Sequence, residues 1–319
     1  MQQNTFKKIL SKYSIVIVLI MIMAACTVAN KNFLTTTNLI NVLRQQSVTI
    51  ILAFGEMMLI ICGQLDLSCG SVIAFAGVLS VMNYKSVGSM GLAFAVAIAV
   101  AVAVNILNGI MVTKFSTPAF IATLATQTMA RGAALYITNG QNVYEIGKYS
   151  VVGQGMIGPI PIPVIFMLVI FAIIAYLMRH TRWGRSTYAV GGNAEAANAS
   201  GINTKRTIMI AYILNGILVG IAAVLFMSRV NGGLPAGASG YEMEGLTATI
   251  VGGTSFTGGI GTAWGTVVGA FVVGFLSNIM NLMSIDSYIQ QIIRGAIIAL
   301  AVIWDIYSKT RQTYRKGGA

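Results

Sequence analysis

Long apolar segments recur from one end of this chain to the other, and they constrain its fold more than any other feature. Of its 319 residues, 56% are hydrophobic and only 9% are charged, and the mean hydropathy is +0.80. A soluble domain carries about 25% charged residues, so these charges are too few to cover a soluble globule of this length. Because lipid offers backbone polar groups no partner, the spanning segments must be helices. The sequence therefore predicts an all-α, polytopic membrane helix bundle in a single transmembrane domain, residues 1–319.

The number of spans follows from the length of these segments, since a helix needs about 20 residues to cross a bilayer. About ten transmembrane helices are expected, some of them broken or re-entrant. The predicted spans are Ser14–Ala29, Ser47–Gly63, Ser68–Met82, Gly91–Val112, Thr117–Thr138, Pro161–Met178, Thr207–Val230, Met243–Phe256, Trp264–Leu282 and Tyr288–Tyr307.

Lysine and arginine are distributed unevenly between the segments that connect these spans. With ten spans and a cytoplasmic N-terminus, 13 of the 20 basic residues lie on the cytoplasmic side, five lie outside and two lie within spans. The positive-inside rule then places both termini and the basic loop of about residues 179–206 in the cytoplasm. The net charge of +12 is therefore read as a topology signal. Nucleic-acid binding is excluded, because no basic patch is interleaved with aromatic residues.

The first apolar segment follows three lysines and resembles the core of a signal peptide. Met23–Cys26 also looks like a lipoprotein cleavage site. Nine more apolar segments follow, so we interpret the segment as an uncleaved first helix. The three cysteines, Cys26, Cys62 and Cys69, have neither metal-site nor disulfide spacing, and we expect them to be small core residues.

The residues that would make this chain an enzyme are missing from its sequence. Gly153–Gly158 spells G-x-G-x-x-G, but it lies in a polar loop without the strand and helix of a dinucleotide site. The segment ending at Gly147 and Lys148 lacks the glycine and the hydroxyl residue of a P-loop. The single histidine, His180, has no evident carboxylate partner. We expect no catalytic residue, no metal site and no bound cofactor here, so any ATP and Mg²⁺ must bind a partner subunit.

Charged residues within the predicted spans leave an alternative open. Of the eight acidic residues, Glu56 is the one that lies clearly inside a span, and Arg131 and Arg294 also lie inside spans. Intramembrane charges are costly and often functional. Glu56 therefore either makes a structural ion pair or polar contact, or it is a titrating group. An ion-coupled secondary transporter would need a titrating group.

A short alanine-rich segment, Asn193–Ser200, stands in the basic loop between two apolar spans. Asn193 can cap a helix whose first turn favours the charge of Glu195, and Gly201 can end it. A slim helix of this kind on the membrane face can insert into a cleft on a soluble subunit. An ordinary connector between spans explains the same pattern, so the residues alone leave both interpretations open.

Two glycine-rich or polar segments interrupt the apolar pattern. Gly252–Gly259 cannot be a comfortable helix, because glycine costs about 1 kcal/mol at each interior helix position. Gly63–Ser71 contains a similar interruption, in which Asp66 and Ser68 either cap the following helix or contact a substrate. Irregular backbone at membrane depth survives only where it is buried in protein or lines a cavity. We therefore predict a break or re-entrant turn at both places.

Three blocks of the chain, Gly63–Ser71, Gly191–Ile202 and Gly240–Gly261, match known sequence patterns. The patterns are G-G-I-D-L-S-V-G-S, G-G-N-x-x-A-A-x-x-S-G-I and G-x-E-L-x-x-I-A-A-V-V-L-G-G-T-S-L-x-G-G-x-G. Through these blocks the chain resembles the permease subunits of bacterial ABC importers for monosaccharides of the ribose and methyl-galactoside type. Order and spacing hold over most of the chain. Gln64 and Cys69 depart from these patterns, which puts the identity of the sugar in doubt.

The resemblance implies a permease in the bacterial cytoplasmic (inner) membrane. It also implies a second permease copy, an ABC ATPase subunit and an extracytoplasmic sugar-binding protein as partners. The implied ATPase-coupling residues are Gly192, Asn193, Glu195, Ala196, Ala197, Ser200 and Gly201. Residues expected along the substrate pathway are Asp66, Ser68, Gly252, Gly253, Thr254 and Ser255, whose hydroxyls, carboxylate and free backbone groups can exchange hydrogen bonds with a sugar. A permease for nucleosides or branched-chain amino acids remains an alternative, as does the secondary transporter.

Overall fold

The computed structural model describes the backbone of residues 2–317 and the side chains of residues 15–303 and 305–307. Its elements are α1 Gln2–Ala29, α2 Thr36–Ile61, α3 Cys69–Val87, α4 Met90–Thr113, α5 Ala119–Ile137, η1 Gly147–Ser150, α6 Val151–Gln154, β1 Met156–Ile157, β2 Ile160–Pro161, α7 Ile162–His180, α8 Arg182–Gly192, α9 Ala194–Ala199, α10 Thr204–Arg229, α11 Tyr241–Val251, α12 Ala263–Leu282 and α13 Ser287–Gly317. The predicted membrane orientation rests partly on basic residues whose side chains lie outside the described ones. These residues are Lys7, Lys8, Lys12, Lys309, Arg311, Arg315 and Lys316.

The helical fold class is confirmed. Each predicted span corresponds to one long or apolar helix, namely α1 to α5, α7 and α10 to α13. The strands of the described chain are limited to one two-residue hairpin, in which β1 pairs antiparallel with β2. Polar side chains start several of the helices: Ser89 accepts a hydrogen bond from the Leu92 amide, and Thr262 accepts one from the Gly265 amide. Such caps satisfy amide groups that the helix itself leaves unpaired.

Five helices of the described chain are long and apolar enough to cross a membrane: Met90–Thr113, Ile162–His180, Thr204–Arg229, Ala263–Leu282 and Ser287–Tyr307. Judged by helix length and hydropathy, the expectation of about ten spans is not confirmed. Helix α11 has 11 residues and is about 16 Å long, which is short of the roughly 30 Å hydrocarbon layer. Helix α2 is long enough, but it carries Arg44 and Glu56.

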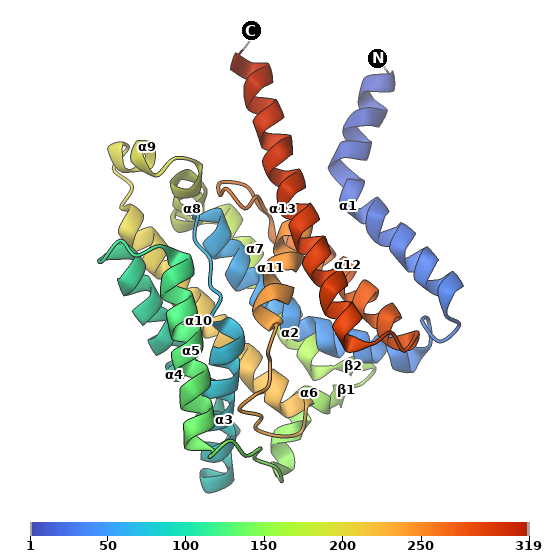
Figure 1. Cartoon of the computed structure of the whole chain (residues 1–319), viewed down its shortest axis with the longest axis vertical. Coiled ribbons are helices and arrows are strands. Elements are labelled where there is room, and N and C mark those ends of the chain that lie inside the picture. The colour runs from blue at the N-terminus through green and yellow to red at the C-terminus, as the bar shows by residue number, and fades with distance from the viewer. Residues whose placement is uncertain (1, 318–319) are drawn as a thin grey trace.

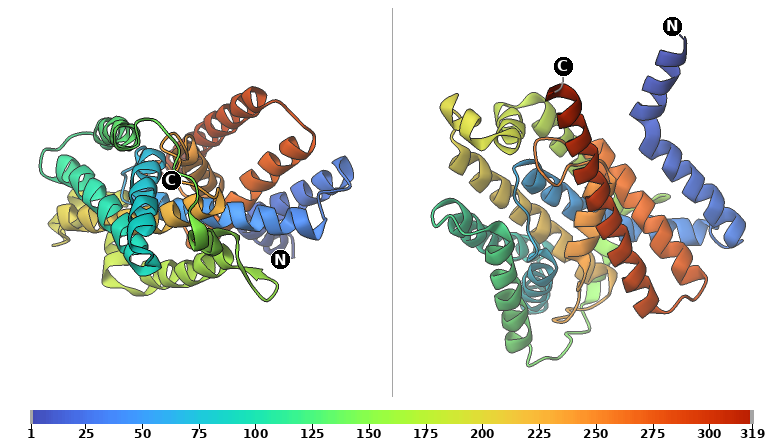
Figure 2. Two further views of the ribbon diagram at one scale, coloured as in Figure 1. Left: turned by 90° about the horizontal axis from the view of Figure 1, so that it is seen from below. Right: turned by 45° about the horizontal axis from the view of Figure 1, so that its top comes forward.

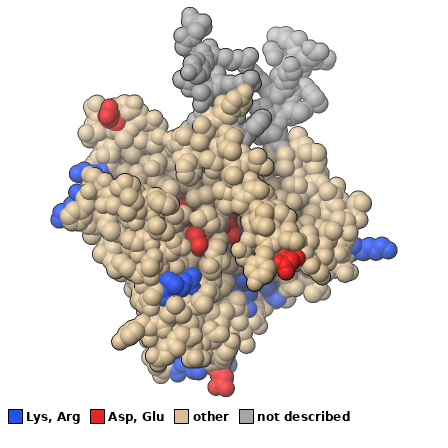
Figure 3. Space-filling view, in the orientation of Figure 1, with Lys and Arg blue, Asp and Glu red and all other residues tan. Residues whose placement is uncertain are grey.

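Helix α2 forms the centre of the molecule. Every one of its side chains from Gln46 to Ile61 is buried, against α10, α11, α12 and α7. Such all-round burial is typical of a helix in the core of a bundle. Helices α3, α4 and α5 lie to one side of α2 and α11, while α1, α12 and α13 lie to the other (Figures 1 and 2). Charged side chains are sparse on the face drawn in Figure 3.

Glycine allows a close helix crossing between α4 and α10. A Cβ atom on Gly216 would lie 2.8 Å from the Val102 Cα, and one on Gly220 would lie 2.5 Å from the Ile98 Cα. Small residues four apart let two backbones approach in this way, as they do in many membrane helix pairs. Glycines also allow close packing between α11 and α12, where Gly265 and Gly269 lie against the backbone at the end of α11.

Substitution of Gly220 by valine should destabilise the folded permease. The added side chain meets the α4 backbone, and overpacking of this kind costs about 1–3 kcal/mol. We expect a clearly lower Tm for detergent-solubilised Gly220→Val than for the wild type. Gly132→Val on α5 is the matched control, because a Cβ there meets no atom within 4 Å. If Gly220→Val and Gly132→Val had the same Tm, the close contact between α4 and α10 would be contradicted.

Two helices begin in the interior of the molecule, and their first turns touch. The non-helical residues 62–68 lead into α3, and residues 230–240 lead into α11. A Cβ on Gly70 would lie 2.6 Å from the Ala238 carbonyl and would meet the Glu242 carboxylate. Figure 1 shows both helix starts near the middle of the molecule. The predicted break at 63–71 is thus confirmed, and the interruption before α11 is one that the sequence analysis did not predict.

Candidate coupling and substrate sites

The alanine-rich segment forms a short capped helix, α9, at the end of the molecule where α1 begins and α13 ends (Figure 1). The Ala196 amide donates to Asn193 Oδ1 at 2.9 Å. Gly201 has a left-handed φ of +83°, and the Ile202 amide closes the helix by donating to the Ala197 carbonyl at 3.0 Å. The predicted cap and end are therefore confirmed. Of the six residues of α9, only Ala197 is buried, so nearly the whole helix is open to a partner.

Helix α8, which leads into α9, packs backbone to backbone on the α11–α12 turn, residues 252–262. A Cβ on Gly191 would overlap the Ile61 carbonyl, and one on Gly258 would lie 2.7 Å from the Gly191 carbonyl. The Gly259 amide donates to that same Ile61 carbonyl at 3.0 Å. We call this contact of α8, the end of α2 and the turn the glycine junction. No side chain separates the three backbones, so α8 is in direct backbone contact with the end of α2 and with the turn.

A tyrosine strengthens the glycine junction. The Tyr188 hydroxyl donates to the Gly261 carbonyl at 2.9 Å. Partial burial raises the pKa of Tyr188 above its ordinary value, because desolvation disfavours the phenolate. The hydroxyl therefore keeps its proton, and this hydrogen bond persists, at neutral and moderately alkaline pH.

The predicted break at Gly252–Gly259 is confirmed as the turn that joins α11 to α12. Gly253 adopts a φ of +84°, and Thr254 and Ser255 are buried. The Ser255 hydroxyl donates to Asp305 Oδ2 at 2.9 Å, and the Phe256 amide donates to the same oxygen at 3.0 Å. The Thr254 hydroxyl is buried without a hydrogen-bond partner. These pathway candidates therefore adjoin the glycine junction, and their contact with a substrate stays a prediction.

Asp66 and Ser68 lie in the interior, far along the chain from that turn. Asp66 Oδ1 accepts from the Ser68 amide at 2.7 Å and Asp66 Oδ2 accepts from Asn215 Nδ2 at 2.7 Å. The Ser68 hydroxyl is bonded to Asp66 and accepts from Asn108 Nδ2 at 3.1 Å. Ser68 occupies the N-cap position of α3 without a side-chain cap bond. The expected cap from Ser68 is therefore wrong, because its hydroxyl is engaged by its neighbours instead.

Glu56 makes a polar contact, and it has no ion-pair partner among the described side chains. It is buried, and its Oε2 accepts from the Asp66 amide at 3.3 Å. Arg131 donates to the Pro235 carbonyl at 2.7 Å and to the Gly237 carbonyl at 2.8 Å, which holds the segment before α11. The described residues contain no group of three or more His, Cys, Asp or Glu side chains that could hold a metal ion.

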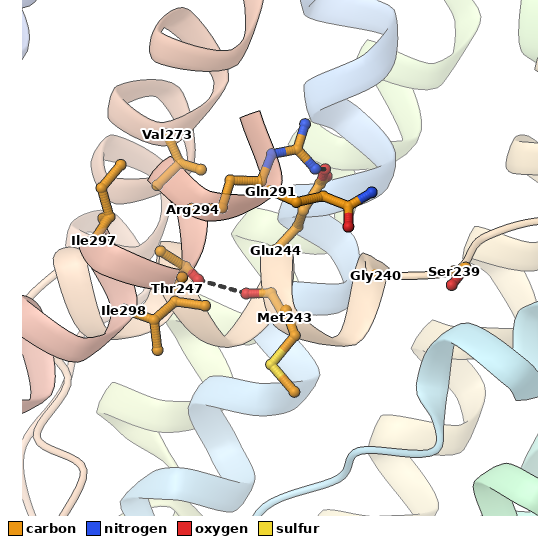
Figure 4. A pocket seen from close by; sticks show the side chains of 11 residues that line it. Ser239, Gly240, Met243, Glu244, Thr247, Val273, Gln291, Arg294, Ile297 and Ile298 are labelled. Carbon is orange, nitrogen blue, oxygen red and sulfur yellow. Dashed lines mark hydrogen bonds and ion pairs between the residues drawn. The ribbon is translucent and has the colours of Figure 1, made fainter. Parts of the chain in front are cut away.

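A pocket between α11 and α13 escaped the sequence analysis. It has a volume of about 380 Å³ and includes Glu244 and Arg294 in its lining. Arg294 Nη1 donates to Glu244 Oε1 at 2.6 Å, the one ion pair among the described side chains. Figure 4 shows the Gln291 amide beside this pair. The sequence places Arg294 inside one predicted span and Glu244 at the start of another. Whether the two side chains pair depends on how α13 packs on α11.

The comparisons with known proteins agree on one group. Residues 38–302 match the family model described as "Branched-chain amino acid transport system / permease component". The chain is 34% identical to the ribose import permease protein RbsC of Haemophilus influenzae, over 93% of each chain. It is 34% identical to the L-arabinose transport system permease protein AraH of Escherichia coli, over 96% of this chain and 93% of the relative. The D-allose transport system permease protein AlsC of E. coli is 32% identical, over 92% and 91% respectively. No solved structure matches the chain.

Proposed function

The chain belongs to the family of branched-chain amino acid transport system permease components, and from this membership we propose that it is the permease subunit of an ATP-driven importer of monosaccharides. Relatives named as permeases for ribose, L-arabinose and D-allose, each matched over more than 90% of this chain, support a sugar as the substrate. The transport subunit itself is no enzyme and holds no cofactor. The observation that carries the proposal is the exposed, capped helix α9 joined to the bundle through the glycine junction.

The energy for transport comes from an ABC ATPase subunit that binds ATP and Mg²⁺ and receives α9 in a cleft. The coupling residues are those predicted from the sequence: Gly192, Asn193, Glu195, Ala196, Ala197, Ser200 and Gly201. Closure of the ATPase on ATP displaces α9 and α8, and the glycine junction passes this movement to α2 and to the α11–α12 turn. The permease then changes its relative population of inward- and outward-facing states. A partner can shift this equilibrium only through its different affinity for the two states.

On the membrane, we propose a multi-pass protein of the bacterial inner membrane with both termini and α9 in the cytoplasm. The shared position of α9 and the two chain ends in Figure 1 supports this orientation, as does the excess of basic residues in the predicted cytoplasmic segments. The hairpin of β1 and β2 then faces outward with η1 and α6, where an extracytoplasmic sugar-binding protein docks. The assembly contains a second permease copy, and the shorter helices complete about ten crossings within the protein interior.

A substrate panel tests the proposal. The permease is reconstituted with its ATPase and its sugar-binding protein in liposomes, and uptake of labelled ribose is measured with competing arabinose, allose and leucine. We expect ATP-dependent uptake of at least one monosaccharide and competition by related sugars. Uptake of leucine with no uptake of any sugar would contradict the proposal.

Branched-chain amino acids are a second candidate, and the family description itself favours them. That description covers the whole family, whereas the three relatives named above are sugar permeases that match almost the full chain. The leucine arm of the same panel separates the two candidates, because a sugar permease leaves leucine outside the liposomes.

A further inference from the structure

The pocket between α11 and α13 combines charged and apolar walls. Helix α11 contributes Met243, Glu244 and Thr247 to its lining. Helix α13 contributes Gln291, Arg294, Gly295, Ile297 and Ile298, and Ser239, Gly240 and Val273 complete it. Its volume of about 380 Å³ lies within the range of about 300–1,000 Å³ that is typical of small-molecule sites.

The polar wall offers both hydrogen-bond donors and acceptors to a ligand. Glu244 is held in place by Arg294 at 2.6 Å and by the Thr49 hydroxyl at 3.4 Å. Arg294 Nε is buried and has no hydrogen-bond partner. The Gln291 side chain is exposed one turn earlier on α13 and lies beside the ion pair in Figure 4. Carboxylate, guanidinium and amide together can accept from and donate to neighbouring hydroxyls.

The opposite wall is apolar. Met243, Val273, Ile297 and Ile298 line it, and Met243 is 41% exposed. A monosaccharide has hydroxyls along its edge and C–H groups on its ring faces, so it needs both kinds of wall. Branched-chain amino acids carry a charged ammonium and carboxylate together, for which the closed Glu244–Arg294 pair offers no free countercharges.

Stability alone gives a weak reason for this ion pair. The Arg294 and Glu244 side chains are 31% and 11% exposed, so solvent screens their charges and desolvation offsets part of their attraction. Charges on membrane helices are costly and commonly mark a substrate pathway. In Figure 3, acidic side chains are visible near the centre of the face over α11, within an otherwise weakly charged surface.

We infer that this pocket is a monosaccharide-binding site on the permease, in which Glu244, Arg294 and Gln291 bind hydroxyls while the side chains of Met243 and Ile298 pack on the ring face. The inference rests on the proposed function and adds the place at which the sugar is held. It also assigns specificity to the permease itself, through the size of the pocket next to Gly295.

Gly295 permits a steric test that spares the fold. It lines the pocket, and a Cβ added there meets no atom within 4 Å. Leucine at this helical position fills the pocket and favours the helix relative to glycine. We expect Gly295→Leu to lower ATP-dependent sugar uptake at least about tenfold, as expected when hydrogen bonds to charged groups are lost. ATP hydrolysis stimulated by the sugar-loaded binding protein should continue. The matched control is Ala296→Leu, which is exposed on the same helix but outside the pocket lining.

Gly295→Ala gives a graded readout that a purely structural role would not change. The added methyl group should reduce uptake of a hexose more than uptake of a pentose, and so shift the ratio of the two kcat/KM values. An unchanged ratio together with wild-type uptake by Gly295→Leu would overturn the inference.

A charge exchange separates binding from stability. The double variant Glu244→Arg/Arg294→Glu can re-form the ion pair, so its Tm should exceed that of Glu244→Arg alone. The exchange moves the carboxylate to α13 and the guanidinium to α11, so neither group reaches the sugar hydroxyl that it binds in the wild type. We therefore expect uptake to remain at least about tenfold below wild type. Recovery of wild-type uptake would show that the pair is only structural and would overturn the inference. If the wild-type complex imports no monosaccharide at all, the proposed function fails, and the inference fails with it.

Discussion

Glu195→Arg is expected to abolish sugar uptake while the permease remains folded in the membrane. Glu195 is exposed in the first turn of α9, so no packing is lost, and an arginine at the positive end of the helix costs about 0.3–1 kcal/mol. At a docked interface, a like-charge contact costs several kcal/mol, which is a loss of more than about a hundredfold in affinity. The measurement is uptake in proteoliposomes, together with co-purification of the ATPase.

Glu195→Gln is the size-matched control for this variant. It removes the charge without adding a cation, so we expect a smaller loss of uptake. Immunoblotting of membranes and the Tm of the purified protein check that both variants fold. Wild-type uptake by Glu195→Arg would show that α9 is a connector between spans and that the ATPase binds elsewhere.

Gly259→Ala is expected to separate ATP hydrolysis from transport. The new Cβ would lie 3.0 Å from the Gly192 Cα at a backbone φ of +75°, a conformation that costs a non-glycine residue about 1–2 kcal/mol. The α11–α12 turn must then move away from α8, and the glycine junction loosens. We expect uptake to fall at least about tenfold, by analogy with other interfaces where one contact of 1–2 kcal/mol is lost. The ATPase should still bind α9 and hydrolyse ATP.

Gly63→Ala is the control for backbone strain. Gly63 also has a left-handed φ, +76°, and follows the same end of α2, but a Cβ there meets no atom within 4 Å. The two variants therefore share the strain and differ in the contact with α8. If Gly63→Ala lost as much coupling as Gly259→Ala, strain alone would explain both, and the glycine junction would have no part in transmission.

The sequence predicted the elements of this fold well where the signal is local. Asn193 and Gly201 predict the start and end of α9 through cap chemistry, and the structure has both. The glycines of Gly252–Gly259 predict the break between α11 and α12 because glycine is costly inside a helix, and Gly253 adopts a left-handed φ there. These features depend on a few neighbouring residues, so they can be inferred without knowledge of the packing.

The tertiary pairings were not predictable in the same way. Glu56 accepts a hydrogen bond from the Asp66 backbone amide and Arg294 pairs with Glu244, whereas the sequence left open whether Glu56 is paired or titrates. Helix α11 is shorter than its apolar stretch suggests, because residues 252–262 leave the helix to pack on α8. Which charges meet depends on helix rotation and crossing, and apolar periodicity says little about either in a chain that is apolar nearly all round.

The proposed function requires that an ATPase subunit which binds α9 supplies the energy for transport. The most direct measurement compares solute accumulation in liposomes that contain the permease with its binding protein, either with or without the ATPase subunit, under an imposed proton gradient or with ATP. We expect uphill sugar accumulation only when the ATPase and ATP are both present. Uphill accumulation driven by the gradient without the ATPase would contradict this expectation and would identify an ion-coupled transporter instead.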